Sequence, residues 1–225
     1  LLCCWRACEI MDLPPASVVA VTMPGFGTTD RTYFNALQLI ELLGCTSRDI
    51  PIAGAVSSHF EDIGHDPSRR DTTYENAQAR ERMQVLFDLA NDLGAIVVGT
   101  GDLSEAALGF STFGGDHLAG YNVNICLNKT TIRALVERLA ETDRFSAAAE
   151  TLRDVLDTPV SPELLPPGED GATLQKSEEI LGPYALHDFF LYYTLRGQFS
   201  AQKLLAYATA AFCRDYTPGV IEEKL

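Results

Sequence analysis

The stretch Gly94-Ala95-Ile96-Val97-Val98-Gly99-Thr100 decides the fold class, because it is a short β-branched run enclosed by glycines. A run of this length and composition is typical of a strand that is buried on both faces. The preceding residues predict a helix from about Tyr74 to Leu93, with Met83 and Phe87 on its buried stripe and Gly94 at its end. A buried strand directly after an amphipathic helix favours a parallel α/β sheet.

The same alternation of strands and helices extends toward both ends of the chain. We expect further strands at residues 17–22 and 49–53, the second followed by the polar stretch 57–73. Further helices are expected from Thr29 or Asp30 to Gly44, and near 130–141, 147–156 and 177–212, with a proline-rich linker at 159–171. These elements predict one α/β domain, a parallel sheet with helices on both faces.

The composition argues against several classes of protein. The chain has 17 Lys and Arg against 31 Asp and Glu, a formal net charge of −14, so a nucleic-acid partner is not expected. Its apolar runs are far shorter than the roughly 20 residues that span a bilayer, and no signal peptide is visible. Six cysteines without CxxC spacing favour reduced thiols and a cytoplasmic location, and dispersed histidines do not favour zinc.

Two polar loops follow the expected strands, where parallel sheets bind their ligands. One is Gly25–Asp30, and the other is Gly99–Glu105, which contains Thr100 and Asp102. A strand-to-helix turn with capping residues explains either loop equally well.

Two cations add to this picture. Arg80 falls with Asn76, Met83 and Phe87 on one stripe of the expected helix, and polar groups on a buried face need partners. Either an ion pair or a pocket for an anionic or ribose-bearing ligand would satisfy Arg80. Lys129 precedes a helix capped by Asn128 or Thr130, where it is either a solvated residue or a phosphate contact.

Five stretches, in order along the chain, resemble the glutamine-dependent NAD⁺ synthetases. They are residues 19–32 (VAVTMPGFGTTDRT), 59–66 (HFEDIGHD), 74–83 (YENAQARERM), 98–105 (VGTGDLSE) and 182–190 (GPYALHDFF). The resemblance covers nearly the whole chain. It implies a Rossmann-like fold of the adenine nucleotide α-hydrolase type.

The resemblance also implies a reaction. In that family, ATP adenylates the nicotinate carboxylate of deamido-NAD and releases pyrophosphate, and ammonia then attacks the acyl-adenylate to give NAD⁺ and AMP. The implied cofactor is Mg²⁺, and the implied partners are ATP, deamido-NAD and ammonia, which a glutaminase domain normally supplies. The family also implies a homo-oligomer, with dimers formed through helices.

Carried over position by position, the resemblance assigns site residues. The expected ATP-binding residues are Thr100, Lys129 and Ser161, and Glu105 is the expected metal ligand. The expected deamido-NAD-binding residues are Asn76, Arg80, Glu105, Phe110, Ser111, Thr112, Phe113 and Asp116, with an aromatic ring of the 110–113 stretch available to stack on the pyridine. The match at Asn76 and Arg80 favours the pocket over the ion pair.

The sequence departs from the family at both ends. The family's Ser-Gly-Gly-x-Asp-Ser phosphate loop is expected just before Leu1, because Leu1–Cys8 resembles the helix that follows it. A further helix and a basic segment are expected after Leu225. We therefore expect residues 1–225 to be a synthetase (ammonia-ligase) domain truncated at both ends, without the glutaminase domain and impaired when alone.

Two other functions fit less well. Another ATP-pyrophosphatase amidotransferase, such as a GMP or asparagine synthetase, would not need the substrate-side residues Asn76, Arg80 and Phe110–Phe113. A degenerate, non-catalytic domain would not need intact polar residues such as Thr100 in its loops.

Overall fold

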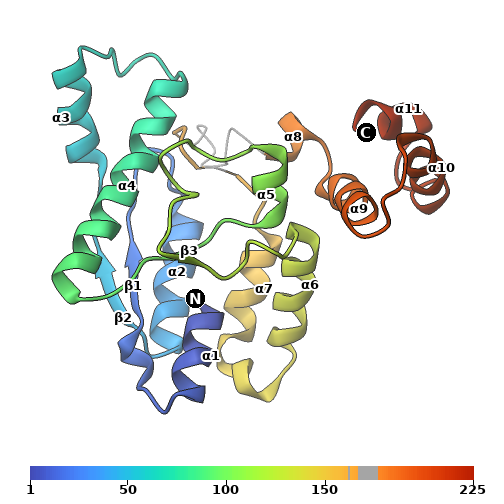
Figure 1. Cartoon of the computed structure of the whole chain (residues 1–225). Helices are drawn as coiled ribbons and strands as arrows, with labels where there is room; N and C mark the ends of the chain where they lie inside the picture. The colour runs from blue at the N-terminus through green and yellow to red at the C-terminus, as the bar shows by residue number, and fades with distance from the viewer. Residues whose placement is uncertain (162, 167–176) are drawn as a thin grey trace.

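The computed structural model describes residues 1–161, 163–166 and 177–225. Its body contains the elements up to α7, and α9, α10 and α11 extend from one side of the body as an arm (Figure 1). None of the helices among the described residues is long and apolar enough to cross a membrane. In chain order the elements are α1 (Leu2–Ile10), β1 (Val19–Thr22), α2 (Asp30–Leu42), β2 (Thr46–Asp49), α3 (Ala53–Ile63), α4 (Thr72–Leu93), β3 (Val98–Gly99), α5 (Leu103–Leu108), β4 (Tyr121–Asn122), α6 (Lys129–Ala140), α7 (Ala149–Asp157), α8 (Ser177–Leu181), α9 (Tyr184–Leu195), α10 (Ala201–Ala211) and α11 (Pro218–Glu223), with 3-10 turns at Pro15–Ser17 and Asp143–Ala148.

The strands form two parallel pairs. β1 pairs with β2, with Val19 opposite Thr46, and β3 pairs with β4, with Val98 opposite Tyr121. Within the described residues, no ladder joins one pair to the other. The prediction of a parallel α/β fold is confirmed, but these strands do not make one continuous sheet.

Two strand predictions need correction. The stretch 94–100 contributes only Val98 and Gly99 to a strand, because the chain leaves α4 over the surface and Ile96 stays 69% exposed. The strand expected at 49–53 is wrong, since β2 ends at Asp49 and the apolar Ile52 is the residue that precedes α3. Ile52 is buried in the core between α3 and α4, so its hydrophobicity marks helix packing and not a strand. Helix α3 itself extends into the polar stretch 57–73 as far as Ile63.

The expected helices 30–43 and 74–93 are confirmed, and their ends have clear causes. The Asp71 carboxylate accepts hydrogen bonds from the amides of Thr73 and Tyr74, which starts α4 two residues earlier than expected. Gly94 ends α4 with a φ of 61°, a left-handed conformation that favours glycine. Thr29 caps α2 in the same way through the amide of Thr32.

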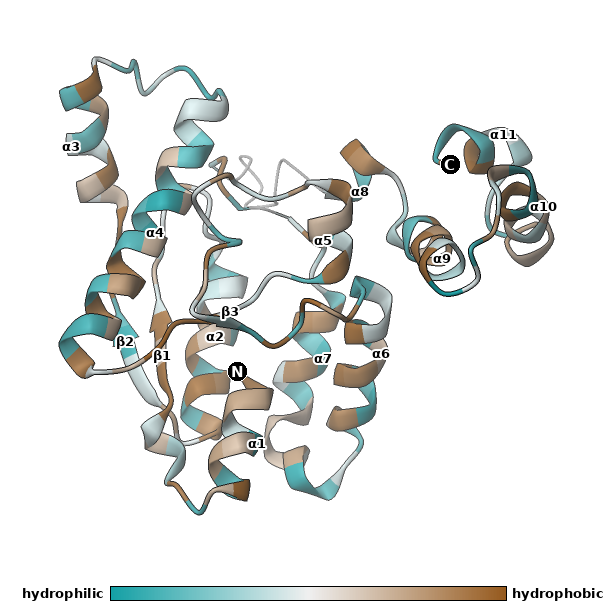
Figure 2. Cartoon of the chain, viewed as in Figure 1, coloured by the Kyte–Doolittle hydropathy of each residue, from teal (hydrophilic) through white to brown (hydrophobic). Residues whose placement is uncertain are grey.

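Three hydrophobic clusters hold the elements together, and Figure 2 shows apolar residues alternating with polar ones along the amphipathic helices that form them. The first joins α2, α6 and α7, and the second joins α3 to α4. Burial of each large apolar side chain contributes about 1.5–3 kcal/mol. The buried residues of the third cluster all lie in the C-terminal arm, α9 to α11: Leu186, Phe190, Leu204, Ala208 and Ile221. The arm therefore has a core of its own.

Candidate active site

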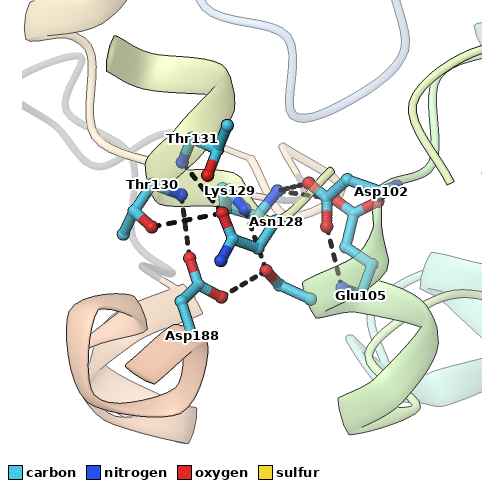
Figure 3. Close-up of polar contacts among 8 residues, drawn as sticks. Asp102, Glu105, Asn128, Lys129, Thr130, Thr131 and Asp188 are labelled. Carbon is cyan, nitrogen blue, oxygen red and sulfur yellow. Dashed lines mark hydrogen bonds and ion pairs between the residues drawn. The ribbon is translucent and has the colours of Figure 1, made fainter. Parts of the chain in front are cut away.

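Lys129 lies at the centre of a polar cluster between α5 and α6 (Figure 3). Its Nζ is 2.7 Å from Asp102 Oδ2 and 2.8 Å from Glu105 Oε1, and the side chains of Lys129 and Asp102 are only 13% and 4% exposed. Burial by itself lowers the pKa of Lys129, but the hydrogen bonds to Asp102 and Glu105 outweigh it and the pKa is raised. Lys129 is therefore a firmly charged cation held by two carboxylates.

The same two carboxylates build the start of α5. Asp102 Oδ1 accepts from the amide of Glu105 at 2.9 Å, and Glu105 Oε2 accepts from the amide of Asp102 at 3.1 Å. This reciprocal capping box uses one oxygen of each carboxylate. The other oxygen of each is directed at Lys129, so the local fold of α5 fixes the place of the ammonium.

This geometry bears on the expected metal ligand. Both oxygens of Glu105 already accept hydrogen bonds, one from Lys129 and one from the amide of Asp102. Across the described residues, no group of three or more His, Cys, Asp or Glu side chains gathers as a metal site. These residues do not by themselves fit a magnesium ion, which in proteins commonly takes further ligands from substrate phosphates and water.

The first amides of α6 are already in use. The amide of Lys129 donates to Ser104 Oγ at 2.9 Å, that of Thr130 to Asp188 Oδ2 at 2.8 Å, and that of Thr131 to Asn128 Oδ1 at 3.0 Å. Asn128 is thus the N-cap. The idea that this helix end draws phosphate through its amides needs correction, because only the Lys129 side chain remains for that role.

The face of α4 that was expected to point inward needs correction as well. Arg80 is exposed, and its Nε donates to the carbonyl oxygen of Phe113 at 3.0 Å. Asn76 is half-buried one turn earlier. The buried polar residue of the helix is Gln78, which is 0% exposed, donates to the carbonyls of Tyr74 and Leu164 and accepts from the amide of Phe26. Residues 77–79 are all buried, so Arg80 lies at the border of that face.

The expected substrate-side residues 110–116 form one loop between α5 and β4. The amide of Phe110 donates to the carbonyl of Glu105 at 3.0 Å, and Asp116 Oδ1 accepts from the amide of Thr112 at 2.7 Å. Phe110 and Thr112 are half-buried, Ser111 and Asp116 are exposed, and Phe113 is 84% exposed. The structure therefore brings Arg80 to this loop and ties the loop to α5.

Two other expected ATP contacts are not part of the described hydrogen bonds of the cluster. Thr100 is exposed and directly follows β3. Ser161 is half-buried, and its Oγ accepts from the amide of Glu163 at 3.1 Å. The described contacts join neither residue to Lys129.

The first polar loop, Gly25–Asp30, is packed against other parts of the chain. A Cβ at Gly27 would lie 2.3 Å from the Glu163 carbonyl oxygen, so the chain around Glu163 rests directly on the loop. Arg82 Nε donates to the carbonyl of Met23 at 3.1 Å, and burial lowers the pKa of Arg82 against the opposing charges of Glu163 and Asp116. These contacts, with the Thr29 cap of α2, account for the loop as a structural turn.

Comparison with known proteins now places the chain in a family. The NAD synthase family model matches residues 7–204. The chain belongs to the NAD synthase family. It is 40% identical over 97% of its length to the glutamine-dependent NAD(+) synthetase of Mycobacterium leprae, of which it covers 34%. It thus spans about a third of the length of such curated relatives.

Solved structures share the fold of this NAD synthase family member. The NMN synthetase of Francisella tularensis superposes with a TM-score of 0.67 at 24% identity, covering 93% of this chain and 78% of that one. A glutamine-dependent NAD(+) synthetase of Cytophaga hutchinsonii gives 0.70 at 19% identity, covering 93% and 32%. The expected Rossmann-like fold class is confirmed.

Sequence reasoning missed several residues of the cluster in this NAD synthase family member. The spacing Asp102-Leu-Ser-Glu105 is the signature of a capping box and could have revealed that these carboxylates act as a pair. Asp188 and Ser104 had no such signal. They lie 84 positions apart, and only the folded arm brings them together.

Proposed function

We propose that this chain is the synthetase domain of a glutamine-dependent NAD⁺ synthetase and that it serves the ATP-dependent amidation of deamido-NAD. Family membership supports the reaction class. The observation that carries the proposal is the Lys129 ammonium held by Asp102 and Glu105. Both carboxylates belong to the start of α5, the helix that follows β3, and parallel sheets bind nucleotides beyond the carboxyl ends of their strands.

In this proposal Lys129 binds an ATP phosphate. As the nicotinate carboxylate attacks the α-phosphorus and the bond to pyrophosphate breaks, negative charge builds on the leaving phosphates, and a fixed cation stabilises it without reorganisation. Thr100 and Ser161 provide hydroxyl contacts to ATP. Magnesium would offset further phosphate charge when bound. Glu105 would hold it only by giving up its bond to Lys129 or to the amide of Asp102, so substrate phosphates and water would supply most of the ligands.

The loop 110–116 and α4 hold deamido-NAD in this proposal. Arg80 offers a guanidinium to the dinucleotide phosphates, and its position at the border of the buried face leaves it accessible. The exposed ring of Phe113 is free to stack on the pyridine, while Asn76, Ser111, Thr112 and Asp116 offer polar contacts. Glu105 links the two halves, because it contacts Lys129 and its carbonyl holds the amide of Phe110.

The surroundings of the chain are part of the proposal. We place it in the cytoplasm as a homo-oligomer that uses ammonia from a glutaminase domain, with neither a nucleic acid nor a membrane as partner. The net charge of −14 supports the absence of a nucleic-acid partner.

Calorimetric titration of the chain with ATP tests the phosphate half. Substitution Lys129→Ala should weaken ATP binding by about tenfold or more, since hydrogen bonds to charged groups contribute roughly 1.5–3 kcal/mol. Arg138→Ala is the matched control, because Arg138 lies on the same helix and pairs with Glu141 at the surface. Equal ATP affinity in all three proteins would contradict the proposal.

Titration with deamido-NAD tests the substrate half. Arg80→Ala and Phe113→Ala should weaken deamido-NAD binding and leave ATP binding unchanged. Xanthosine monophosphate serves as the competing ligand, because preferential binding of that nucleotide would favour a GMP synthetase. Binding of neither nucleotide would favour a degenerate domain.

A further inference from the structure

Asp188 is a buried carboxylate that the proposed reaction does not use. It lies on α9 of the C-terminal arm, is 2% exposed, and points into the junction between α5 and α6 (Figure 3). Its Oδ1 accepts from the hydroxyl of Ser104 on α5, and its Oδ2 accepts from the amide of Thr130 on α6 at 2.8 Å. One carboxylate thus contacts both helices that supply the Lys129 cluster.

These bonds enclose the backbone of Lys129. Because the Ser104 hydroxyl donates its hydrogen to Asp188, its oxygen faces the amide of Lys129 and accepts from it at 2.9 Å. The next amide along, that of Thr130, is held by Asp188 directly. The position of Lys129 at the start of α6 is therefore fixed from both sides by groups that Asp188 orients.

The charge of Asp188 matters as much as its geometry. The N-terminus of a helix carries a partial positive charge, which disfavours a lysine at the first helical position. The Asp188 carboxylate, which accepts from the amide of Thr130, opposes that charge. Asp102 and Glu105 compensate the Lys129 ammonium itself, so each positive element of the junction faces a carboxylate.

We propose that Asp188 is a positioning residue through which the C-terminal arm sets the location of the Lys129 ammonium. The proposal rests on the proposed function in so far as Lys129 contacts ATP. The positioning role of Asp188 extends the proposed function, because it makes nucleotide binding depend on the C-terminal arm. The arm has its own hydrophobic core, and its helix α9 contacts both α5 and α6. Loss of the Asp188 carboxylate should free α6 to shift against α5 and release Lys129 from its two carboxylates.

The test measures the reactivity of the Lys129 amine with an acylating reagent, read by mass spectrometry on the whole chain. Labelling of Lys129 is expressed relative to Lys203, which lies on the exposed side of the arm. In the unaltered chain Lys129 should react slowly, because it is enclosed and paired. Asp188→Ala and Ser104→Ala should raise its relative labelling by about tenfold, and Asp188→Asn by less, since an amide oxygen still accepts from Thr130.

Phe190→Leu is the control for a general loosening of the arm, because Phe190 lies on the same helix as Asp188 and its side chain belongs to the arm core. It should lower the stability of the arm and leave the labelling of Lys129 unchanged. Labelling of Asp188→Ala at the level of the unaltered chain, or equal labelling in Phe190→Leu, would overturn the proposal. If Asp188→Ala does not fold, Asp188→Asn and Ser104→Ala decide the question in the same assay.

ATP titration separates this proposal from the proposed function. Asp188→Ala should weaken ATP binding, and the double variant with Lys129→Ala should bind no more weakly than Lys129→Ala alone, because both act through one ammonium. Fully additive losses would overturn the positioning role while leaving the ATP contact intact. Unchanged ATP affinity in Lys129→Ala would instead refute the ATP contact, whatever the labelling shows.

Discussion

The cluster around Lys129 and the loop 110–116 differ in how completely their polar groups are paired. In the cluster, Lys129, Asp102 and Asp188 are largely buried, and each makes at least two described hydrogen bonds or ion pairs. In the loop, Phe113 is almost fully exposed, and Arg80 holds the loop through one backbone carbonyl. One region is rigidly built, while the other presents its groups to solvent.

This difference suggests a division of labour. A cation that must stabilise charge in a transition state works best when its position is fixed in advance. A loop that receives a large dinucleotide can instead form its contacts as the ligand arrives, at a cost in ordering. The variants below test whether the two regions differ in this way.

Lys129→Ala should produce the largest loss of stability. It leaves the buried Asp102 carboxylate without its cation, and removing one member of a buried pair costs about 3 kcal/mol or more. Denaturation by urea measures the change. The double variant Lys129→Ala with Asp102→Asn should recover part of the loss, and Arg138→Ala should stay within roughly 0.5 kcal/mol. A small loss in Lys129→Ala would show that the cluster is not rigidly built.

Glu105→Gln should cost less at neutral pH, about 1 kcal/mol, but should change the response to alkali. The pKa of Lys129 is raised above 10.5 in the folded chain, so its contribution to stability is fully present below about 10.5 and is lost as the pH rises through the folded value. Without the Glu105 charge that folded value falls, and the loss begins at lower pH. Denaturation midpoints measured across the alkaline range test this shift. Glu137→Gln, an exposed change on α6, the helix of Lys129, should not move it.

Arg80→Ala should affect the loop more than the whole fold. It removes the bond to the Phe113 carbonyl, for which a net loss of about 1 kcal/mol or less is expected at an exposed position. Limited proteolysis should cleave the segment 110–118 several times faster. Gln84→Ala, an exposed residue one turn further along α4, is the matched control. Identical cleavage of Arg80→Ala and the unaltered chain would show that this contact does not hold the loop.

Phe113→Ala should change stability least, within roughly 0.5 kcal/mol, because the ring is 84% exposed and little burial is lost. Thermal unfolding measures the effect. A loss above 2 kcal/mol would mean that the ring packs in the folded chain and is not held ready for a ligand.

The sequence predicted those parts of the fold that depend on neighbouring residues. Helix α4 was found because its stripe and the terminating Gly94 are local signals, although Asp71 starts it earlier. The strand predicted at 49–53 was wrong, because the apolar Ile52 packs in the core with α3 and α4. No local sequence pattern encodes that contact. Helical spacing shows that Arg80 shares a stripe with Met83 and Phe87, but it does not show which stripe is buried. The hydrogen bonds of Gln78 to Leu164 and Phe26 identify the buried face, and they depend on residues far away in the sequence.

The candidate site divides in the same way. Glu105 and Lys129 were found separately by resemblance, but their ion pair across 24 positions was not foreseen. Asp188 lies within the stretch 182–190 that carries the resemblance, yet its role depends on bonds to Thr130 and Ser104, which are 58 and 84 positions away. Contacts of this kind arise only when the arm packs on α5 and α6.

The two parallel strand pairs have a consequence for the behaviour of the chain at high concentration. β1 and β3 each pair on one side, and among the described residues their other sides carry backbone amides and carbonyls without a partner strand. Such edges are templates on which another extended segment can add. The net charge of −14 opposes the approach of a second copy, and salt screens that repulsion. The chain should therefore aggregate more readily as ionic strength rises, through the unpaired edges of β1 and β3.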